Sequence, residues 1–314
     1  RRDDADVAVA CARALALLTE LRGPALVDET LLAAVSGMPS VTEGARAFVE
    51  EGRALLLAGL GRPDEARVAV EAAAKAAAGL PIRERSILLA RLATVLVDRA
   101  PEESDQLVDR ALIDATACSD DAALGLALAV KARLDHLLGR PREAEERFER
   151  ALALLRVVGE KRIEARTLEG LALLHGERGR PLRARSLFEQ ALSLQREVGD
   201  RHASAPLLDA IASLLSEEGE RHRAAATWDE ALQGARECGD RRVEARVRAH
   251  RAVSERRSDA GESARHGLLA ALTLSREVGD RALEAELLHE LGELDLSLGH
   301  LAAADSYLQR SLQG

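Results

Sequence analysis

A short motif that returns every 40 residues is the feature that most constrains the fold of this chain. Residues 196–200 read Arg-Glu-Val-Gly-Asp, residues 276–280 repeat them, and residues 236–240 differ only by Cys238. Weaker copies stand at 157–160 and 118–120. A period of about 20 to 50 residues is typical of a solenoid, in which each unit buries its apolar face only against its neighbours. We therefore predict a stacked array rather than a compact globule.

Small and large side chains recur at fixed places within each copy and predict two helices per copy. The first helix carries a small residue at Ala132, Ala172, Ala212, Ala252 and Gly292, and a turn glycine follows at Gly139, Gly179, Gly219 and Gly299. The second helix carries a small residue (Ala144, Ala184, Ala224, Ala264, Ala304), a large one four later (Phe148, Phe188, Trp228, Leu268, Leu308) and a small one three later (Ala151, Ala191, Ala231, Ala271, Ser311). This spacing places the three on one helical face. We expect the small residues to let the two helices approach and the large one to fill the gap.

The organisation along the chain follows from this register. Residues 1–40 lack the landmarks of the repeat and predict an irregular helix pair, with helices near 5–21 and 27–35. This pair is either a cap or the stump of an upstream domain. The array occupies residues 41–314, with helices at 43–58 and 63–79 and then copies at 81–120, 121–160, 161–200, 201–240, 241–280 and 281–314. Because the chain begins with Arg1 rather than Met, we expect it to belong to a longer protein.

Composition supports helices and argues against several classes of function. Ala, Leu, Glu and Arg dominate, and these residues favour helix. The net charge of −9 and the aromatic content of 2% argue against a nucleic-acid binder, which needs basic patches and rings for stacking. No apolar run reaches the roughly 18–20 residues that cross a bilayer, and no signal peptide opens the chain. We expect a cytoplasmic protein whose cysteines (Cys11, Cys118 and Cys238) are reduced, with Cys238 buried.

The succession of small residue, turn glycine, Ala, Phe and Ala resembles the tetratricopeptide repeat, in a lengthened 40-residue form. The resemblance covers residues 41–314 and is strongest from residue 121. It implies an all-α, right-handed superhelical solenoid of about eight antiparallel helix pairs. The phrase at 191–200, Ala-Leu-Ser-Leu-Gln-Arg-Glu-Val-Gly-Asp, is similar to arrays in large bacterial signalling proteins. Those arrays commonly follow a regulatory ATPase or a Ser/Thr protein-kinase domain and sense or recruit partners.

Motifs for catalysis or cofactor binding are missing from the sequence. Gly59-Leu60-Gly61 and the pair Gly176 and Gly179 are read as turns, because no strand precedes them and no Gly-Lys-Ser/Thr follows. No two histidines are spaced i,i+4, and no cysteine lies near a second cysteine or a histidine in sequence, so the usual metal-ligand spacings are absent. No nucleophile elbow is present. We expect no catalytic residues, no cofactor and no metal.

The resemblance also implies where a partner would bind, because in this family the first helix of each pair lines the concave side. Positions 6, 9, 10, 13, 16 and 17 of each copy form one stripe along that helix. We predict that partner-binding residues are among Arg133, His136, Arg166, Glu169, Asp209, Arg246, His250, Arg256, Arg257 and His289. The Asn-and-Lys clamp with which some family members hold C-terminal carboxylates is not expected, because this chain contains no Asn.

The copy at 241–280 departs from the others. Its first helix, over residues 241–257, holds seven Arg and two Glu, and Arg248, Arg251 and Ser254 occupy slots that are apolar in sister copies. One interpretation is that the arginine stems pack along the core edge while their charged ends reach water, which would make this the loosest copy. The other is a docking site for an acidic partner, since guanidinium groups match carboxylate and phosphate geometry.

Three functional hypotheses remain open at this point. The first is a non-enzymatic scaffold that binds a protein or a peptide, acidic near residues 246–257, through the concave groove. The second is a regulatory arm, autoinhibitory or sensing, of an ATPase or kinase domain outside this chain, in which case the partner is that domain. The third is a receptor for a small molecule or a signal peptide, for which Val130, Leu137 and Leu173 would supply apolar contacts.

Overall fold

A computed structural model describes residue 10 and residues 26–38, 41–256 and 261–312. Within these residues every regular element is a helix. The chain divides into two compact units, Arg1–Val198 and Gly199–Gly314, which are described separately.

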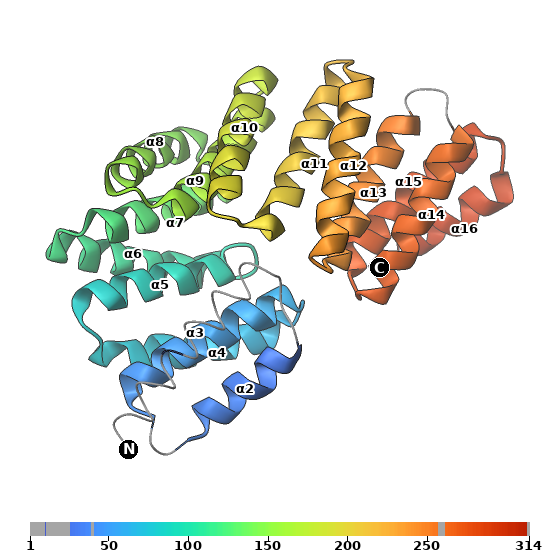
Figure 1. Cartoon of the computed structure of the whole chain (residues 1–314). Helices are drawn as coiled ribbons and strands as arrows, with labels where there is room; N and C mark the ends of the chain where they lie inside the picture. Colours follow the sequence, from blue (N-terminus) through green and yellow to red (C-terminus); the bar gives the residue numbers. More distant parts are fainter. Residues whose placement is uncertain (1–9, 11–25, 39–40, 257–260, 313–314) are drawn as a thin grey trace. The chain divides into compact units, whose positions relative to one another are not determined.

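The first unit is a succession of antiparallel helix pairs. Helix α2 (Leu26–Ser36) packs on α3 and agrees with the helix predicted at 27–35, whereas the helix predicted near 5–21 lies outside the described residues. Four pairs follow: α3 (Glu43–Gly59) with α4 (Pro63–Ala76), α5 (Ile82–Leu96) with α6 (Pro101–Cys118), α7 (Asp121–Leu137) with α8 (Pro141–Val158), and α9 (Lys161–Glu177) with α10 (Pro181–Glu197). A short 3-10 helix, η1 (Ala77–Gly79), ends the first of them. The pairs lie one after another in Figure 1.

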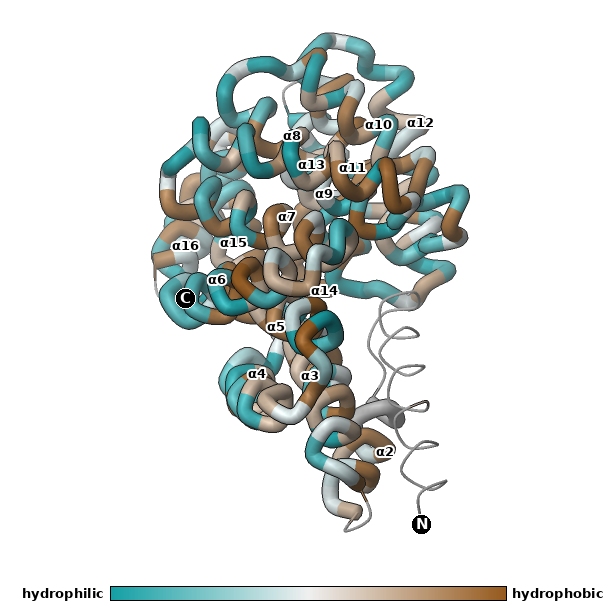
Figure 2. The backbone as a smooth tube through the Cα atoms, turned by 90° about the vertical axis from the view of Figure 1, so that its left-hand side faces the viewer, coloured by the Kyte–Doolittle hydropathy of each residue, from teal (hydrophilic) through white to brown (hydrophobic). Residues whose placement is uncertain are grey.

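The second unit continues the same pattern. Its three pairs are α11 (Arg201–Glu217) with α12 (Arg221–Glu237), α13 (Arg241–Arg256) with α14 (Gly261–Glu277), and α15 (Arg281–Ser297) with α16 (Leu301–Ser311). The described residues therefore contain seven pairs, at the positions that the 40-residue register predicts. Hydrophobic and hydrophilic residues alternate along the helices (Figure 2), which is the pattern of helices buried on one side only.

The repeating motif is the turn that joins one pair to the next. Val198 ends α10, Gly199 adopts a left-handed conformation with φ of +72°, and the Asp200 side chain accepts a hydrogen bond from the Ala203 amide at 3.0 Å. The glycine is needed because other residues adopt positive φ at a cost. An aspartate at this place caps the next helix. Asp120, Asp240 and Asp280 make the same hydrogen bond.

The charged residues of the motif also join neighbouring helices. Its arginine reaches the fourth residue of the next helix, as in Arg276–Glu284 at 2.7 Å. Its glutamate returns to the start of the first helix in its own pair, as in Lys161–Glu197 at 2.7 Å. This last contact joins the start of one helix to the end of its partner, so the two helices run antiparallel. The strongest repeat in the sequence thus has a structural role.

The core residues predicted from spacing lie between the helices of each pair. Ala144, Ala184 and Ala264 have no exposed surface, and Phe148, Phe188, Trp228 and Leu268 are buried. The last pair is the exception, since Leu308 and Ser311 are only half-buried because no further pair covers α16 in the described chain. Cys238 is half-buried rather than buried, because it ends α12 at the turn.

Candidate functional site

The helices of each unit form two layers that differ in spacing. In the first unit α3 contacts α5, α5 contacts α7 and α7 contacts α9; in the second, α11 contacts α13 and α13 contacts α15. Consecutive second helices of the described pairs make no comparable contacts. Since the first helices are closer together, each unit curves toward them. We call the open side of the first-helix layer in each unit its inner face.

On the inner face of the first unit, charged residues connect neighbouring first helices. Arg133 of α7 pairs with Asp98, just beyond α5, at 2.7 Å, and His136 pairs with Glu177 of α9 at 2.7 Å. Arg166 is exposed and Glu169 half-buried. Burial raises the pKa of Glu169, and the nearby guanidinium groups of Arg166 and Arg133 oppose that rise.

Two leucines lie among these charges. Leu137 and Leu173 occupy stripe positions on α7 and α9, and their exposed fractions are 52% and 48%. Val130, the third apolar residue that we expected to line a pocket, is buried in the core. The inner face of the first unit is therefore a mixed surface, with apolar side chains surrounded by charges of both signs.

The inner face of the second unit holds a different arrangement. Asp209 of α11, which we predicted among the partner-binding residues, is buried and accepts two hydrogen bonds. One comes from Nε1 of Trp228 to Oδ1 at 2.9 Å, and the other joins Nδ1 of His250 to Oδ2 at 2.7 Å. The hydrogen bond with Asp209 raises the pKa of His250 above its ordinary value.

The remaining predicted residues of this unit differ in whether they form ion pairs within the chain. Arg256 pairs with Glu290 at 3.2 Å and with Glu293 at 3.1 Å, and His289 lies 3.4 Å from Glu293. Arg246 is exposed and makes no ion pair with the residues that the structure describes. Arg257 lies outside the described residues.

The three polar residues that occupy core positions of α13 each have a polar partner on the same or a neighbouring helix. Arg248 pairs with Glu244 at 2.9 Å, Arg251 pairs with Asp229 at 2.6 Å, and the hydroxyl groups of Ser254 and Ser216 lie 2.5 Å apart. All three residues of α13 are half-buried, which agrees with arginine stems along the core edge. Since most of its arginines are neutralised, α13 as a whole is not an open basic surface.

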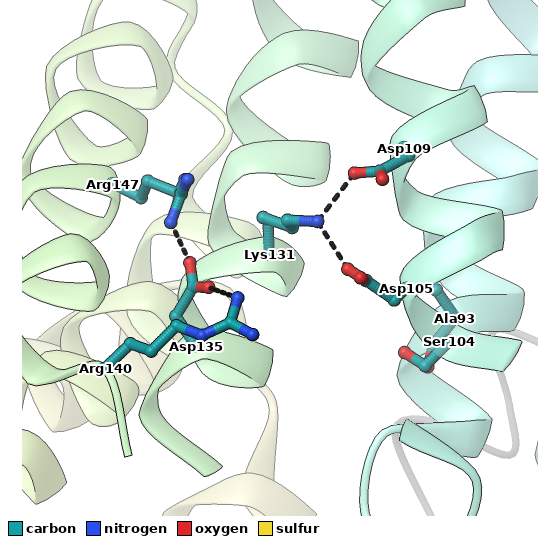
Figure 3. Close-up of polar contacts among 8 residues, drawn as sticks. All are labelled: Ala93, Ser104, Asp105, Asp109, Lys131, Asp135, Arg140 and Arg147. Atoms are coloured by element: carbon teal, nitrogen blue, oxygen red, sulfur yellow. Dashed lines mark hydrogen bonds and ion pairs between the residues drawn. The ribbon is translucent and has the colours of Figure 1, made fainter. Parts of the chain in front are cut away.

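Sequence reasoning missed a set of buried polar residues at position 15 of the copies. Asp135 contacts Arg147 of α8 and lies 3.6 Å from Arg140, while Lys131, one turn earlier, reaches Asp105 and Asp109 of α6 (Figure 3). The equivalent residues are His175 in the copy at 161–200 and Asp295 in the copy at 281–314, and both are buried. A partial signal was available, because position 15 is polar in the copies at 121–160, 161–200, 241–280 and 281–314, although Leu215 occupies it in the copy at 201–240.

The pKa values of these position-15 residues are set by burial and by their partners. Burial raises the pKa of Asp135, and the charge of Arg147 opposes that rise. Burial alone would raise the pKa of Asp295, but hydrogen bonds from Arg265 at 2.7 Å and His300 at 3.2 Å lower it. Burial lowers the pKa of His175, whose Nε2 lies 3.7 Å from the Glu145 carboxylate. Such groups tie neighbouring helices together and lie away from the inner face.

The described residues contain no group of three or more His, Cys, Asp or Glu side chains arranged to hold a metal ion. Among those residues, no helix is both long enough and apolar enough to span a bilayer.

Comparison with known proteins identifies the fold. No protein-family model matches the chain, and no curated protein matches it significantly. A solved structure of a Rap protein complexed with competence and sporulation factor has a TM-score of 0.76 at 16% identity, over 98% of this chain and 84% of the other. The Rap conjugation gene regulator of plasmid pLS20, in complex with the Phr* peptide, has a TM-score of 0.66 at 15% identity, over 88% and 78% of the two chains.

A third similar structure belongs to a protein that is described as having a tetratricopeptide repeat. It is a signal transduction ATPase with numerous domains from Pyrococcus horikoshii that has a tetratricopeptide repeat sensor, with a TM-score of 0.63 at 16% identity over 96% of this chain and 47% of the other. The chain is a tetratricopeptide-like repeat array. At these identities the likeness concerns the fold alone, so the array's partner has to be argued from its own residues.

Proposed function

We propose that the array is a non-enzymatic recognition scaffold that binds a peptide or a peptide-like segment of a partner protein on the inner face of a unit. The observation that carries this proposal is the first-helix layer, which is closely packed yet keeps exposed apolar and charged side chains on its open side. Preformed helices bind a segment without the ordering cost that weakens flexible binders. Curved repeat arrays present extended concave surfaces of this kind.

Two further observations support the proposal. Leu137 and Leu173 are large apolar residues that remain half exposed on the inner face of the first unit, and they suit an apolar anchor of a bound segment. The pLS20 regulator, which has the same fold, is described in complex with a peptide. Mixed charges around the leucines would set the register and orientation of that segment.

The test is a selection of peptides from a displayed library on the intact chain, followed by calorimetry with the selected peptides. We expect Leu173→Asp and Arg133→Glu, on the inner face, to weaken binding at least tenfold. The matched variants Val157→Asp and Arg150→Glu change exposed residues of the second helix α8 and should leave the affinity unchanged. Selected peptides whose affinity is lost equally in both sets, or in neither, would contradict an inner-face site.

A second candidate is a sensor arm of a signalling ATPase or kinase. The structural likeness to the archaeal ATPase favours it, because this array corresponds to 47% of that chain. The bound segment would then belong to the enzyme domain itself. The genomic sequence upstream of Arg1 tests this candidate: a phosphate-binding loop or kinase signature in the same reading frame supports it, and an initiator methionine close to Arg1 opposes it.

A further inference from the structure

The carboxylate of Asp209 is a buried charged group at the inner face of the second unit. Its exposed fraction is only 4%, and both of its oxygens are committed, one to the indole of Trp228 on α12 and one to the imidazole of His250 on α13. Burying a carboxylate is costly unless it accepts hydrogen bonds, and a buried indole N–H needs an acceptor. The arrangement holds the carboxylate and the two rings in fixed relation.

This arrangement determines which nitrogen of His250 is available. With Nδ1 donating to Asp209, Nε2 is the nitrogen that remains, and it has no hydrogen-bond partner among the residues that the structure describes. The His250 side chain is 49% exposed. Arg246 lies one helical turn earlier on α13, where side chains four residues apart share a face, and it too is exposed without an ion pair to the described residues.

We propose that Arg246 and His250 form a binding site for a peptide carboxylate on the inner face of the second unit, with Asp209 and Trp228 as positioning residues. The inference rests on the proposed function and specifies its ligand chemistry. A protonated imidazole donates from both nitrogens, so Nε2–H and the Arg246 guanidinium would both donate to one carboxylate. Hydrogen bonds between charged partners are the strong ones.

Recognition by this site depends on pH. The groups that face His250 are Asp209 on α11, Arg246 on its own helix and Glu286 on α15; the first and last favour the protonated ring and Arg246 opposes it. Because the pKa of His250 lies above the ordinary value of about 6.5, the ring is charged below that raised pKa. Carboxylate binding is therefore complete at lower pH and is lost as the pH rises through the raised value.

The experiment follows the ring resonances of His250 by NMR in the intact chain, assigned with His250→Gln. The probes are acetyl-tetra-alanine with a free C-terminus, the same peptide as its C-terminal amide, and acetyl-Ala-Glu-Ala-amide, which carries only a side-chain carboxylate. At pH 6 we expect the first to shift the ring resonances and the amide not to. The third distinguishes a site for any carboxylate, if it binds, from a site for chain termini, if it does not.

Variants separate binding from positioning. Arg246→Gln should weaken the free peptide roughly tenfold while leaving His250 protonated at pH 6. Asp209→Asn should lower the His250 pKa measured by titration and abolish the peptide's effect at pH 6, whereas a merely structural change would leave that pKa in place. Arg276→Gln, on α14 and paired with Glu284, is the matched control and should change neither quantity.

Two results would overturn the carboxylate site: identical shifts with the free and amidated peptides, or binding that is unchanged by pH and by Arg246→Gln. They leave the recognition scaffold intact if library peptides still bind through Leu173. Conversely, specific carboxylate binding at His250 without any library peptide would uphold the site and refute the broader scaffold proposal. Circular dichroism on each variant confirms that a lost signal does not reflect unfolding.

Discussion

At the scale of single residues, neighbouring repeats come so close at a few glycines that an added methyl group would clash with an adjacent helix. Gly170 of α9 is such a position, because a Cβ built there would lie 2.7 Å from Cζ of Phe148. Phe148 is buried, with 1% exposed, so the ring cannot move aside cheaply. The neighbouring repeats therefore approach closely at this point.

We expect Gly170→Ala to destabilise the array by ~1–3 kcal/mol through overpacking, despite the better helix propensity of Ala. Gly176→Ala in the same helix is the matched control, since its nearest neighbour would be Cβ of Ala184 at 3.9 Å. That variant should stabilise by up to about 1 kcal/mol. Urea denaturation followed by circular dichroism measures both, and equal stabilisation by the two variants would show that Phe148 yields.

At the scale of helices, α11 contains a proline, Pro206, in its interior, where proline is unfavourable. Pro206 lies inside the helix, at a stripe position, although the other helices that contain proline begin with it. An internal proline removes one backbone hydrogen bond and its ring crowds the preceding turn. The helix is continuous over Arg201–Glu217 all the same, so tertiary packing outweighs the local penalty.

Pro206→Ala should stabilise α11 by ~1–3 kcal/mol and raise the thermal midpoint of the chain. Pro181→Ala, at the first position of α10, controls for the change in the unfolded chain. There the missing N–H has no helical partner, so we expect a loss of about 0.4–1 kcal/mol. A lower midpoint for Pro206→Ala would mean that the proline fits a local geometry which alanine cannot hold.

The helices, the turns and the core positions could be predicted from the sequence, because each copy repeats the same spacing of small residues, large residues and turn glycines. The helix predicted to begin at residue 43 does so, and Thr42 caps it by accepting a hydrogen bond from the Ala45 amide. The candidate sites do not follow in the same way. The Asp209, Trp228 and His250 contact depends on three residues that occur together in no other copy, 19 and 41 residues apart. Periodicity predicts that such positions face each other, but not which side chains bond.

The charge of α13 illustrates the same limit. Seven arginines over residues 241–257 predict a basic surface, yet Arg248, Arg251 and Arg256 pair with acids on their own and adjacent helices. Those acids come from different copies, and their distances depend on how the pairs stack. Arg246 is distinguished from the others only once these contacts are known.

At the scale of the molecule, a repeat array is stabilised by each repeat and by its nearest neighbours, so distant repeats can unfold separately. The chain offers a direct way to observe this, because its single tryptophan, Trp228, is buried in α12 of the second unit. Its fluorescence reports on that unit, whereas far-ultraviolet circular dichroism reports on helices throughout the chain.

We expect Gly170→Ala, in the first unit, to lower the urea midpoint seen by circular dichroism while the fluorescence midpoint stays where it is. Gly267→Ala should instead lower the fluorescence midpoint, because its Cβ would lie 2.9 Å from that of Ala252 within the second unit. Two probes that moved together in both variants would require strong coupling along the whole chain. A ligand on one inner face would then stabilise the other, whereas separate transitions confine each ligand's stabilising effect to the unit it contacts.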